Sequence, residues 1–197
     1  MNMKKGSIAE LYMRVLKEVG ALSAEPEFMD LENTPMRVER MLRDELLSSY
    51  RPGALKELKR KFTMFPAPTG KKSAMVVEQG IAFSSMCGHH MLPFSGVAHV
   101  GYVPRQKVAG LSKIPRAVDF FSNKLQIQER LVVEIADFLV EMLDPVAVIV
   151  YMEARHSCME VRGVRKSNVL TKTSAIRPVK MDASIKNEFY SVIGVRS

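Results

Sequence analysis

The sequence predicts an α+β protein with a helical N-terminal segment, and three observations lead to this class. Apolar residues recur at helical spacing through the first third of the chain. A segment rich in proline, glycine and lysine, residues 66–72, then interrupts the pattern. After it, runs rich in valine, isoleucine and phenylalanine stand as two pairs on either side of a long helical stretch, which is an α+β order.

The first helix is expected over residues 8–19, where apolar side chains repeat every three to four positions. Ser7 and Glu10 have the spacing of a capping box, in which the serine caps the helix and the glutamate reaches back to it. Gly20 is a residue type that commonly ends a helix. These signals set both ends of the first helix.

Two further helices are expected before the break. One begins at Thr34, as its cap, with Pro35 in the first turn, and runs to about residue 50. A shorter one is expected at residues 54–61. We therefore predict a helical extension over residues 1–66 and a separate α+β domain over residues 67–197.

The second domain is expected to hold four strands and three helices. A central helical stretch, residues 114–142, divides into two helices near Lys124, since one apolar stripe continues through its second half. A closing helix is expected at residues 183–193. The strands are predicted at residues 74–83, 95–103, 146–154 and 170–176.

Composition limits the function classes. At 197 residues the chain can bury a sizeable core. No apolar run approaches the roughly 20 residues that span a bilayer, and residues 1–12 lack the apolar segment of a secretory signal, so we expect a cytoplasmic protein without a membrane partner. The net charge of +8 favours an anionic partner, and composition leaves nucleic acid, a nucleotide or an acidic surface open.

Two short segments hold both cysteines and three of the four histidines. Cys87 and His90 are three residues apart, a spacing at which both side chains can reach one metal ion. Cys158 follows an apolar strand, and if that strand persists, His156 and Cys158 project to the same face. With Cys87, His90 and Cys158 as ligands, a fourth tetrahedral position would remain for water, as in catalytic zinc sites.

Each of these residues also has an ordinary interpretation. A buried cysteine often acts as a small apolar residue, and the two cysteines could instead form a disulfide, which the expected compartment disfavours. His89 and His156 could move protons beside a metal-bound water or could only hydrogen-bond to the ligands. His99 lies within an alternating strand and is expected to be structural.

Five segments form one pattern along the chain: residues 33–38, 85–94, 110–116, 126–131, and 156–158 with 162–165. Together they resemble the GTP cyclohydrolase I family. The resemblance covers residues 8–193 and implies a zinc-dependent hydrolase that converts GTP and water to formate and 7,8-dihydroneopterin triphosphate. In that reaction the guanine imidazole ring opens, the ribose rearranges and the pterin ring closes.

The resemblance assigns roles to the metal and catalytic candidates. Cys87, His90 and Cys158 correspond to the ligands of Zn²⁺. His156 corresponds to the proton donor to the purine nitrogen that becomes a leaving amine, and His89 to the histidine of later proton transfers.

The resemblance also assigns the GTP-binding residues. Glu129 corresponds to the residue that reads the base, because a carboxylate accepts both parallel donors on one guanine edge, and Gln128 is expected to contribute beside it. Without the resemblance, each charged residue would be assigned to solvated surface. The triphosphate residues correspond to Ser112, Lys113, Arg116 and Arg162.

For fold and assembly, the resemblance implies a tunnelling fold, an antiparallel four-stranded sheet with helices on one face, for residues 67–197. It further implies a homo-oligomer, a decamer of two pentameric rings with active sites at subunit interfaces. GTP is then the expected partner, and no nucleic acid is expected. Folate, biopterin and deazaguanine routes all begin with this reaction, so the route stays open.

One position departs from the common form of the family. Gly88 follows the first cysteine where a glutamate is usual, which removes a negative charge and makes the loop more flexible. The proposed metal ligands are unaffected, so the rate of turnover is the property most in question.

Two other functions compete with this one. Related tunnelling-fold proteins act on pterins or deazapurines, and the matching cysteines, histidines and basic residues speak against that chemistry. A basic nucleic-acid-binding protein with structural zinc would carry aromatic side chains among its basic residues for stacking on bases. The segments 56–61 and 162–166 lack that pattern.

Overall fold

The computed structural model describes residues 4–26, 29–68 and 74–195. Contacts along the chain separate two compact units, Met1–Ser48 and Ser49–Ser197. The division places residues 49–66 with the second unit, where the Phe62 ring packs edge-on against Phe138 at 5.2 Å between centroids. The domain boundary after residue 66 stays a prediction.

The first unit is helical, as the periodicity predicts. The helices Ile8–Glu18 and Thr34–Met41 pack together through Ala9, which is fully buried and donates its N–H to Glu39 Oε2 at 2.9 Å. The elements are α1 (Ile8–Glu18), α2 (Ala21–Ala24), the 3-10 turn η2 (Leu31–Asn33), α3 (Thr34–Met41) and the π-helical turn η3 (Leu42–Leu46).

At the start of α1, one of the two hydrogen bonds of the expected capping box is present. The Ser7 hydroxyl accepts a hydrogen bond from the Glu10 N–H at 3.2 Å. The Glu10 carboxylate does not return to Ser7, because it accepts from the Gly6 N–H instead. The cap is therefore confirmed and its reciprocal bond is not.

The second of the expected helices, α3, differs from expectation at both ends. Thr34 is its first residue and Asn33 occupies the cap position. The Thr34 hydroxyl is engaged by Arg37 Nη2 at 2.9 Å, and Arg37 also pairs with Asp30 at 2.7 Å, so the hydroxyl serves this cluster rather than the helix N–H groups. At its other end α3 gives way to η3 instead of continuing to residue 50.

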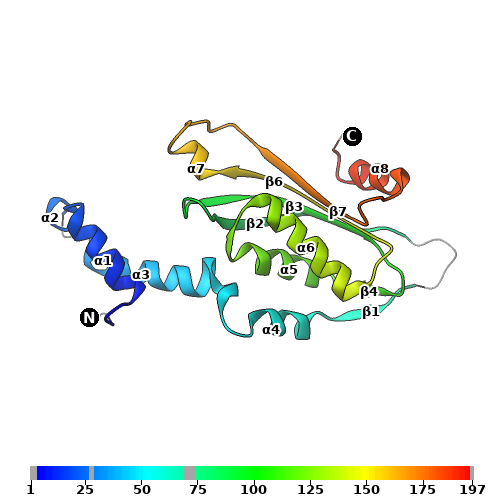
Figure 1. Cartoon of the computed structure of the whole chain (residues 1–197), viewed down its shortest axis with the longest axis horizontal. Helices are drawn as coiled ribbons and strands as arrows, with labels where there is room; N and C mark the ends of the chain where they lie inside the picture. Colours follow the sequence, from blue (N-terminus) through cyan, green and yellow to red (C-terminus); the bar gives the residue numbers. More distant parts are fainter. Residues whose placement is uncertain (1–3, 27–28, 69–73, 196–197) are drawn as a thin grey trace. The chain divides into compact units, whose positions relative to one another are not determined.

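The second unit is α+β and is centred on a five-stranded mixed sheet (Figure 1). The four expected strands are all present and run antiparallel to their neighbours, but β5 adds a fifth strand parallel to β2. The prediction of a purely antiparallel four-stranded sheet is therefore wrong. In spatial order the strands are β5 (Leu125–Gln126), β2 (Val76–Cys87), β3 (Pro93–Val103), β6 (Ala147–His156) and β7 (Thr171–Arg177).

A small second sheet and several helices complete this unit. The two central helices meet across β5, close to Lys124 as expected, and both lie on one face of the sheet (Figure 1). The remaining elements are η4 (Ser48–Tyr50), α4 (Ala54–Lys61), β1 (Met64–Pro66) paired with β4 (Lys107–Ala109), α5 (Lys113–Ser122), α6 (Gln128–Leu143), α7 (Ser157–Glu160) and α8 (Ala183–Val192).

Both faces of the large sheet bury apolar side chains. The main core lies between the sheet and α5 and α6, and includes Leu131, Ile135 and Val150. On the opposite face α8 inserts Phe189, whose ring lies 2.5 Å from where a Cβ on Gly101 would stand. The prediction that helices cover only one face of the sheet is therefore wrong. Because Gly101 has no side chain, Phe189 of α8 can pack against the second face.

Within the described residues, no helix is long and apolar enough to cross a bilayer.

Glu78 lies at an irregularity of the sheet, where the β2–β3 register shifts between Glu78 and Ile81. Burial raises the pKa of its carboxyl to about 7 from an ordinary value of 4.5. The unfolded chain therefore ionises at lower pH than the folded one, and Glu78 lowers stability progressively as the pH rises from 4.5 to 7.

Replacing this carboxyl by an amide is expected to stabilise the protein above neutral pH. For Glu78→Gln we expect a gain on the order of 1 kcal/mol at pH 8, a value reduced for partial exposure, and little change at pH 5. Melting temperatures of both proteins at the two pH values measure this. An equal difference at pH 5 and pH 8 would show that ionisation of Glu78 is not the cause.

Candidate metal centre and active site

Cys87, His90 and Cys158 lie together at one end of the large sheet. Their ligand atoms are all within 4.8 Å of one another, and Cys87 Sγ is 3.8 Å from His90 Nδ1. The topology explains this: the start of β3 pairs with the end of β2 through Met86↔Pro93 and with the end of β6 through Phe94↔His156. The two strand ends that carry the segments are thereby adjacent.

The route by which Cys158 reaches the group differs from expectation. β6 ends at His156, and Cys158 lies in the helical turn α7. The alternation of side chains along a continuing strand is therefore the wrong explanation. The turn of α7 directs the Cys158 side chain toward Cys87, while His156 faces the interior as a strand residue.

The three side chains fit a tetrahedral metal ion of zinc type. Zinc bound to thiolate and imidazole at its usual bond lengths separates sulfur from nitrogen by about 3.6 Å, close to the 3.8 Å between Cys87 and His90. Cys87 is buried and His90 is exposed, so the group opens on one side. Burial and the adjacent Cys87 thiol raise the pKa of the Cys158 thiol, so a metal ion bound here would have to displace its proton.

The turn after Cys87 is held by the backbone on both sides. The Cys87 N–H donates to Leu92 O and the Met91 N–H donates to Cys87 O, both at 2.9 Å. The Gly88 N–H donates to Gln126 O at 2.8 Å, which ties the turn to β5.

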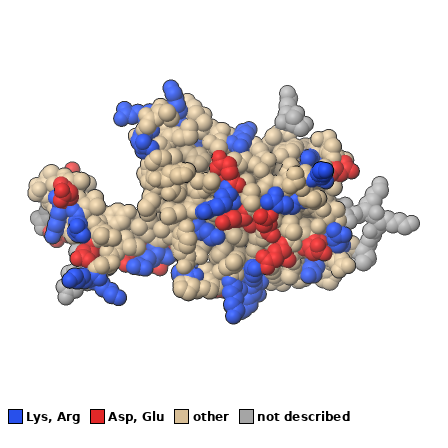
Figure 2. Space-filling model, viewed as in Figure 1, with Lys and Arg blue, Asp and Glu red and all other residues tan. Residues whose placement is uncertain are grey.

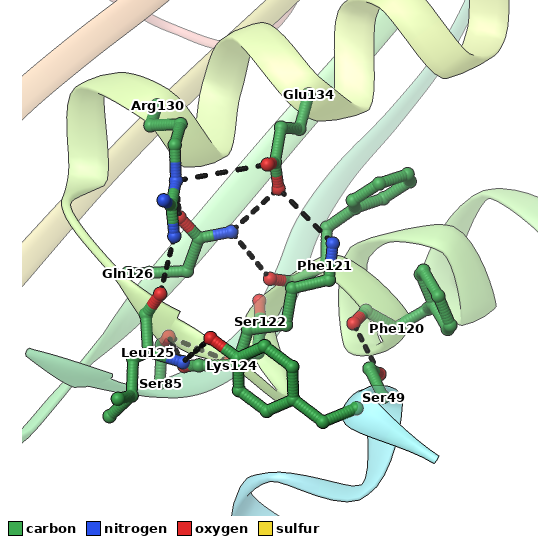
Figure 3. A network of polar contacts seen from close by, with 11 residues as sticks. Ser49, Ser85, Phe120, Phe121, Ser122, Lys124, Leu125, Gln126, Arg130 and Glu134 are labelled. Atoms are coloured by element: carbon green, nitrogen blue, oxygen red, sulfur yellow. Dashed lines mark hydrogen bonds and ion pairs between the residues drawn. The ribbon is translucent and has the colours of Figure 1, made fainter. Parts of the chain in front are cut away.

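A buried polar network holds β5 in place (Figure 3). The Gln126 side chain is 1% exposed, and its Nε2 donates to Phe121 O at 2.9 Å and to Glu134 Oε2 at 2.7 Å. Arg130 Nε donates to Gln126 Oε1 at 2.8 Å, and the Arg130 guanidinium also bonds to Leu125 O. The backbone that receives the Gly88 N–H is therefore fixed from the helix side.

Gly88 is not required by space or backbone conformation. Its φ lies outside the left-handed region, and an added Cβ would approach Gln126 backbone atoms no closer than 3.6 Å. We therefore expect Gly88→Ala to keep its fold and to gain about 0.4–1 kcal/mol through the less flexible unfolded chain.

Thermal unfolding of Gly88→Ala measures this gain. Gly96→Ala is the matched comparison, since its Cβ would stand 1.9 Å from Glu153 O and should destabilise the β3–β6 pair strongly. A lower melting temperature for Gly88→Ala would contradict the expectation. If it holds, Gly88→Glu isolates the effect on turnover of the carboxylate that is usual in the family.

His156 is held by contacts on two sides. Its ring stacks on Phe94 with centroids 4.6 Å apart and planes 5° apart, and its Nε2 is 2.8 Å from Gln128 Oε1. Burial lowers the pKa of His156, while the charges of Glu129 and Glu160 oppose this.

The Gln128 side chain lies in the interior. It is 1% exposed, and its Nε2 donates to Met152 O at 3.2 Å and to Thr171 O at 3.0 Å. Both amide donors are thus engaged, and Oε1 contacts His156. A contribution of Gln128 to base binding stays a prediction.

Glu129 and His89 are both exposed near this group. Glu129 lies in the first turn of α6, close enough to His156 for its charge to raise the pKa of the imidazole. The His89 ring is 6.2 Å from the His90 ring. His99 lies apart, on the sheet face opposite α5 and α6, with its ring 5.8 Å from that of Tyr151.

The expected triphosphate residues lie in two places. Ser112 is the cap of α5, followed by Lys113 and Arg116, whereas Arg162 lies in the exposed loop after α7, close enough to Cys158 to lower the pKa of its thiol. In the described part of the chain, no hydrogen bond or ion pair joins the α5 residues to the Cys–His–Cys group. None of the three cations forms an ion pair among those residues.

Basic side chains gather over the part of the surface that Figure 1 draws around α7 (Figure 2), where Glu160 of α7 is paired with Arg155. The exposed loop after α7 supplies Arg162, Arg165 and Lys166. This end of the second unit therefore suits an anionic ligand.

Sequence reasoning missed the part played by Phe94. It stood within a matched segment, but its contact with His156 depends on the β3–β6 register, which pairs these two residues directly. A single sequence carries no signal for that register.

The chain is similar to one protein family over nearly its whole length. The model of the GTP cyclohydrolase I family matches residues 8–194. The GTP cyclohydrolase 1 of Porphyromonas gingivalis is 38% identical over 193 residues, covering 98% of this chain and 97% of that protein. The GTP cyclohydrolase 1 of Parabacteroides distasonis is 41% identical over 187 residues, covering 95% and 91%.

One solved structure is also similar, the apo form of the archaeosine synthase QueF-Like. It is 19% identical, with a TM-score of 0.45, over 54% of this chain and 95% of that chain.

Proposed function

The chain belongs to the GTP cyclohydrolase I family and is an enzyme of that kind, and from this premise we propose that it converts GTP and water to formate and 7,8-dihydroneopterin triphosphate with zinc as cofactor. The observation that carries the proposal is the Cys87, His90 and Cys158 group, with ligand atoms within 4.8 Å, next to the segment that holds His156. A metal-ligand set beside a proton-carrying side chain is what hydrolytic ring opening needs.

Cys87, His90 and Cys158 would hold the zinc. When bound, zinc supplies a Lewis acid and lowers the pKa of a coordinated water toward about 7.

His156 and His89 are the proton-transferring residues of the proposed reaction. Because His156 Nε2 is engaged by Gln128 Oε1, Nδ1 is the ring nitrogen left to exchange a proton with the opening guanine ring. His89 is exposed and free to serve the later steps on the ribose.

Glu129 reads the guanine base. Its carboxylate is exposed at the start of α6 and can accept both the ring N–H and the exocyclic amine. The N-terminus of α6 is a favourable position for this negative charge.

The triphosphate is held by positive charge from two segments. Lys113 and Arg116 are three residues apart on α5, whose N-terminus adds backbone N–H donors next to the Ser112 hydroxyl. Arg162 supplies the third cation from the loop after α7. That these cations have no ion-pair partners in the described residues supports an external anion.

We extend the proposal to fold and assembly: a tunnelling fold in a cytoplasmic homo-oligomer, with the decamer of two pentameric rings as the expected form. Exposed apolar side chains support assembly. On α1 and its C-cap residue they recur at Leu11, Val15 and Val19, which are 54%, 53% and 69% exposed and follow one another at a spacing of four residues.

The test is incubation of zinc-loaded protein with GTP. Formate release and, after oxidation, pterin fluorescence should appear in equal amounts, one of each per GTP consumed. Metal-loaded, folded protein that forms neither product would disprove the proposed activity.

A further inference from the structure

Gln128 is a buried glutamine whose amide orientation is set by the backbone. Met152 O and Thr171 O both face its amide nitrogen, at 3.2 and 3.0 Å. Carbonyl oxygens only accept hydrogen bonds, so the NH₂ group must point at them and Oε1 must point away. The reverse orientation would place three acceptors against one another in a buried site.

This orientation determines what His156 presents to it. Oε1 can only accept, and His156 Nε2 lies 2.8 Å away, so Nε2 must carry a proton and donate it. In the neutral imidazole the lone pair then lies on Nδ1. The orientation of one buried amide thus selects one tautomer of the histidine.

The ring plane of His156 is set independently by Phe94. The two rings are stacked within 5° of parallel, so the contact with Phe94 fixes the plane of the imidazole. Rotation of the ring within that plane is then prevented by the hydrogen bond to Gln128. Phe94 comes from β3, His156 from β6 and Gln128 from the start of α6, so three elements meet at one imidazole.

We propose that Gln128 is a positioning residue of this enzyme, which holds His156 as the Nε2–H tautomer and thereby makes Nδ1 the nitrogen that exchanges a proton with the substrate. The inference rests on the proposed function. The Gln128 side chain contacts Met152 O, Thr171 O and His156, and in this role it acts on proton transfer through His156. A purely structural Gln128 would tie α6 to β6 and β7 by its two donor bonds without any effect on the imidazole.

The test replaces the amide by an apolar side chain of similar length, Gln128→Met. We expect kcat to fall at least about 10-fold, as part of the roughly 10²- to 10⁴-fold that a positioned proton-transferring side chain contributes in full. KM for GTP and zinc content should stay within about twofold of the parent protein, since neither Glu129 nor the ligand set is changed.

A second readout does not depend on activity. Solid-state ¹⁵N NMR of histidine-labelled protein, with and without zinc, should show His156 protonated on Nε2 and unprotonated on Nδ1. Only four histidines contribute signals, and His156→Asn identifies the relevant pair. In Gln128→Met we expect the proton to distribute between both nitrogens.

Ser85→Ala is the matched control for lost buried hydrogen bonds. Ser85 is 1% exposed and donates to Ser122 O at 2.7 Å, without contact to His156. It should lower the melting temperature but leave the His156 signals unchanged. An unchanged tautomer in Gln128→Met, or a loss of kcat that follows melting temperature or zinc content in both variants, would overturn the inference.

Failure of the proposed function would look different. If the parent protein makes no pterin, the activity is wrong, while the NMR result still decides whether Gln128 controls His156.

Discussion

Cys158→Ala is expected to lose bound zinc and turnover together. Zinc sites of this kind contribute roughly 10 kcal/mol or more of binding free energy, so the loss of one protein ligand in three should cost about 3 kcal/mol, or ~100-fold in affinity. Cys87 and His90 alone, 3.8 Å apart, would then compete poorly with a weak chelator. Zinc per subunit after dialysis and pterin formation from GTP are the two measurements.

Ser157→Ala is the matched control for this prediction, because it alters the same short turn, α7, without removing a ligand atom. It should retain zinc at the parent level. If Cys158→Ala also kept one zinc per subunit and turned over GTP, the three-residue metal centre would be wrong.

Glu129→Ala is expected to keep zinc and lose recognition of guanine. A carboxylate that accepts two donors of the base makes two charge-assisted hydrogen bonds, each contributing about 1.5–3 kcal/mol. Their loss should reduce kcat/KM for GTP by roughly 10²- to 10⁴-fold. The metal ligands are not changed, so zinc content should equal that of the parent protein.

Inosine triphosphate sharpens this test because it lacks the exocyclic amine that one of the two bonds needs. The parent protein should prefer GTP strongly, whereas Glu129→Ala should treat the two nucleotides nearly alike. Glu141→Ala, an exposed carboxylate about 18 Å further along α6, is the matched control and should preserve the preference. A Glu129→Ala protein that still prefers GTP would place the base pocket elsewhere.

Most helices and strands could be predicted because their signals are local. The cap of α1 by Ser7, the whole of α4 and the four long strands follow from residue types within a few positions of one another. β5 could not, since a strand of two residues carries no periodicity and depends on its partner Met86–Cys87. The change from α3 to η3 likewise has no signature in side-chain spacing.

The candidate site divides in the same way. The residue types at Cys87, His90 and Cys158 indicate a metal centre before any fold is known, because thiolates and imidazoles in short segments are what zinc binds. The expectation that Cys158 extends the strand β6 was wrong, since the point at which β6 ends depends on its pairing with β3.

The sequence by itself therefore determined the α+β class, the family resemblance and the identity of the proposed metal ligands, all of which depend on residue type and local spacing. Tertiary structure alone decided the fifth strand, the helix on the second face of the sheet and the place of Gln128. Its partners Met152, Thr171 and His156 lie 24 to 43 residues away along the chain. Hydrogen bonds between such distant residues exist only once β6, β7 and α6 have packed together, so they cannot be predicted from a local sequence pattern.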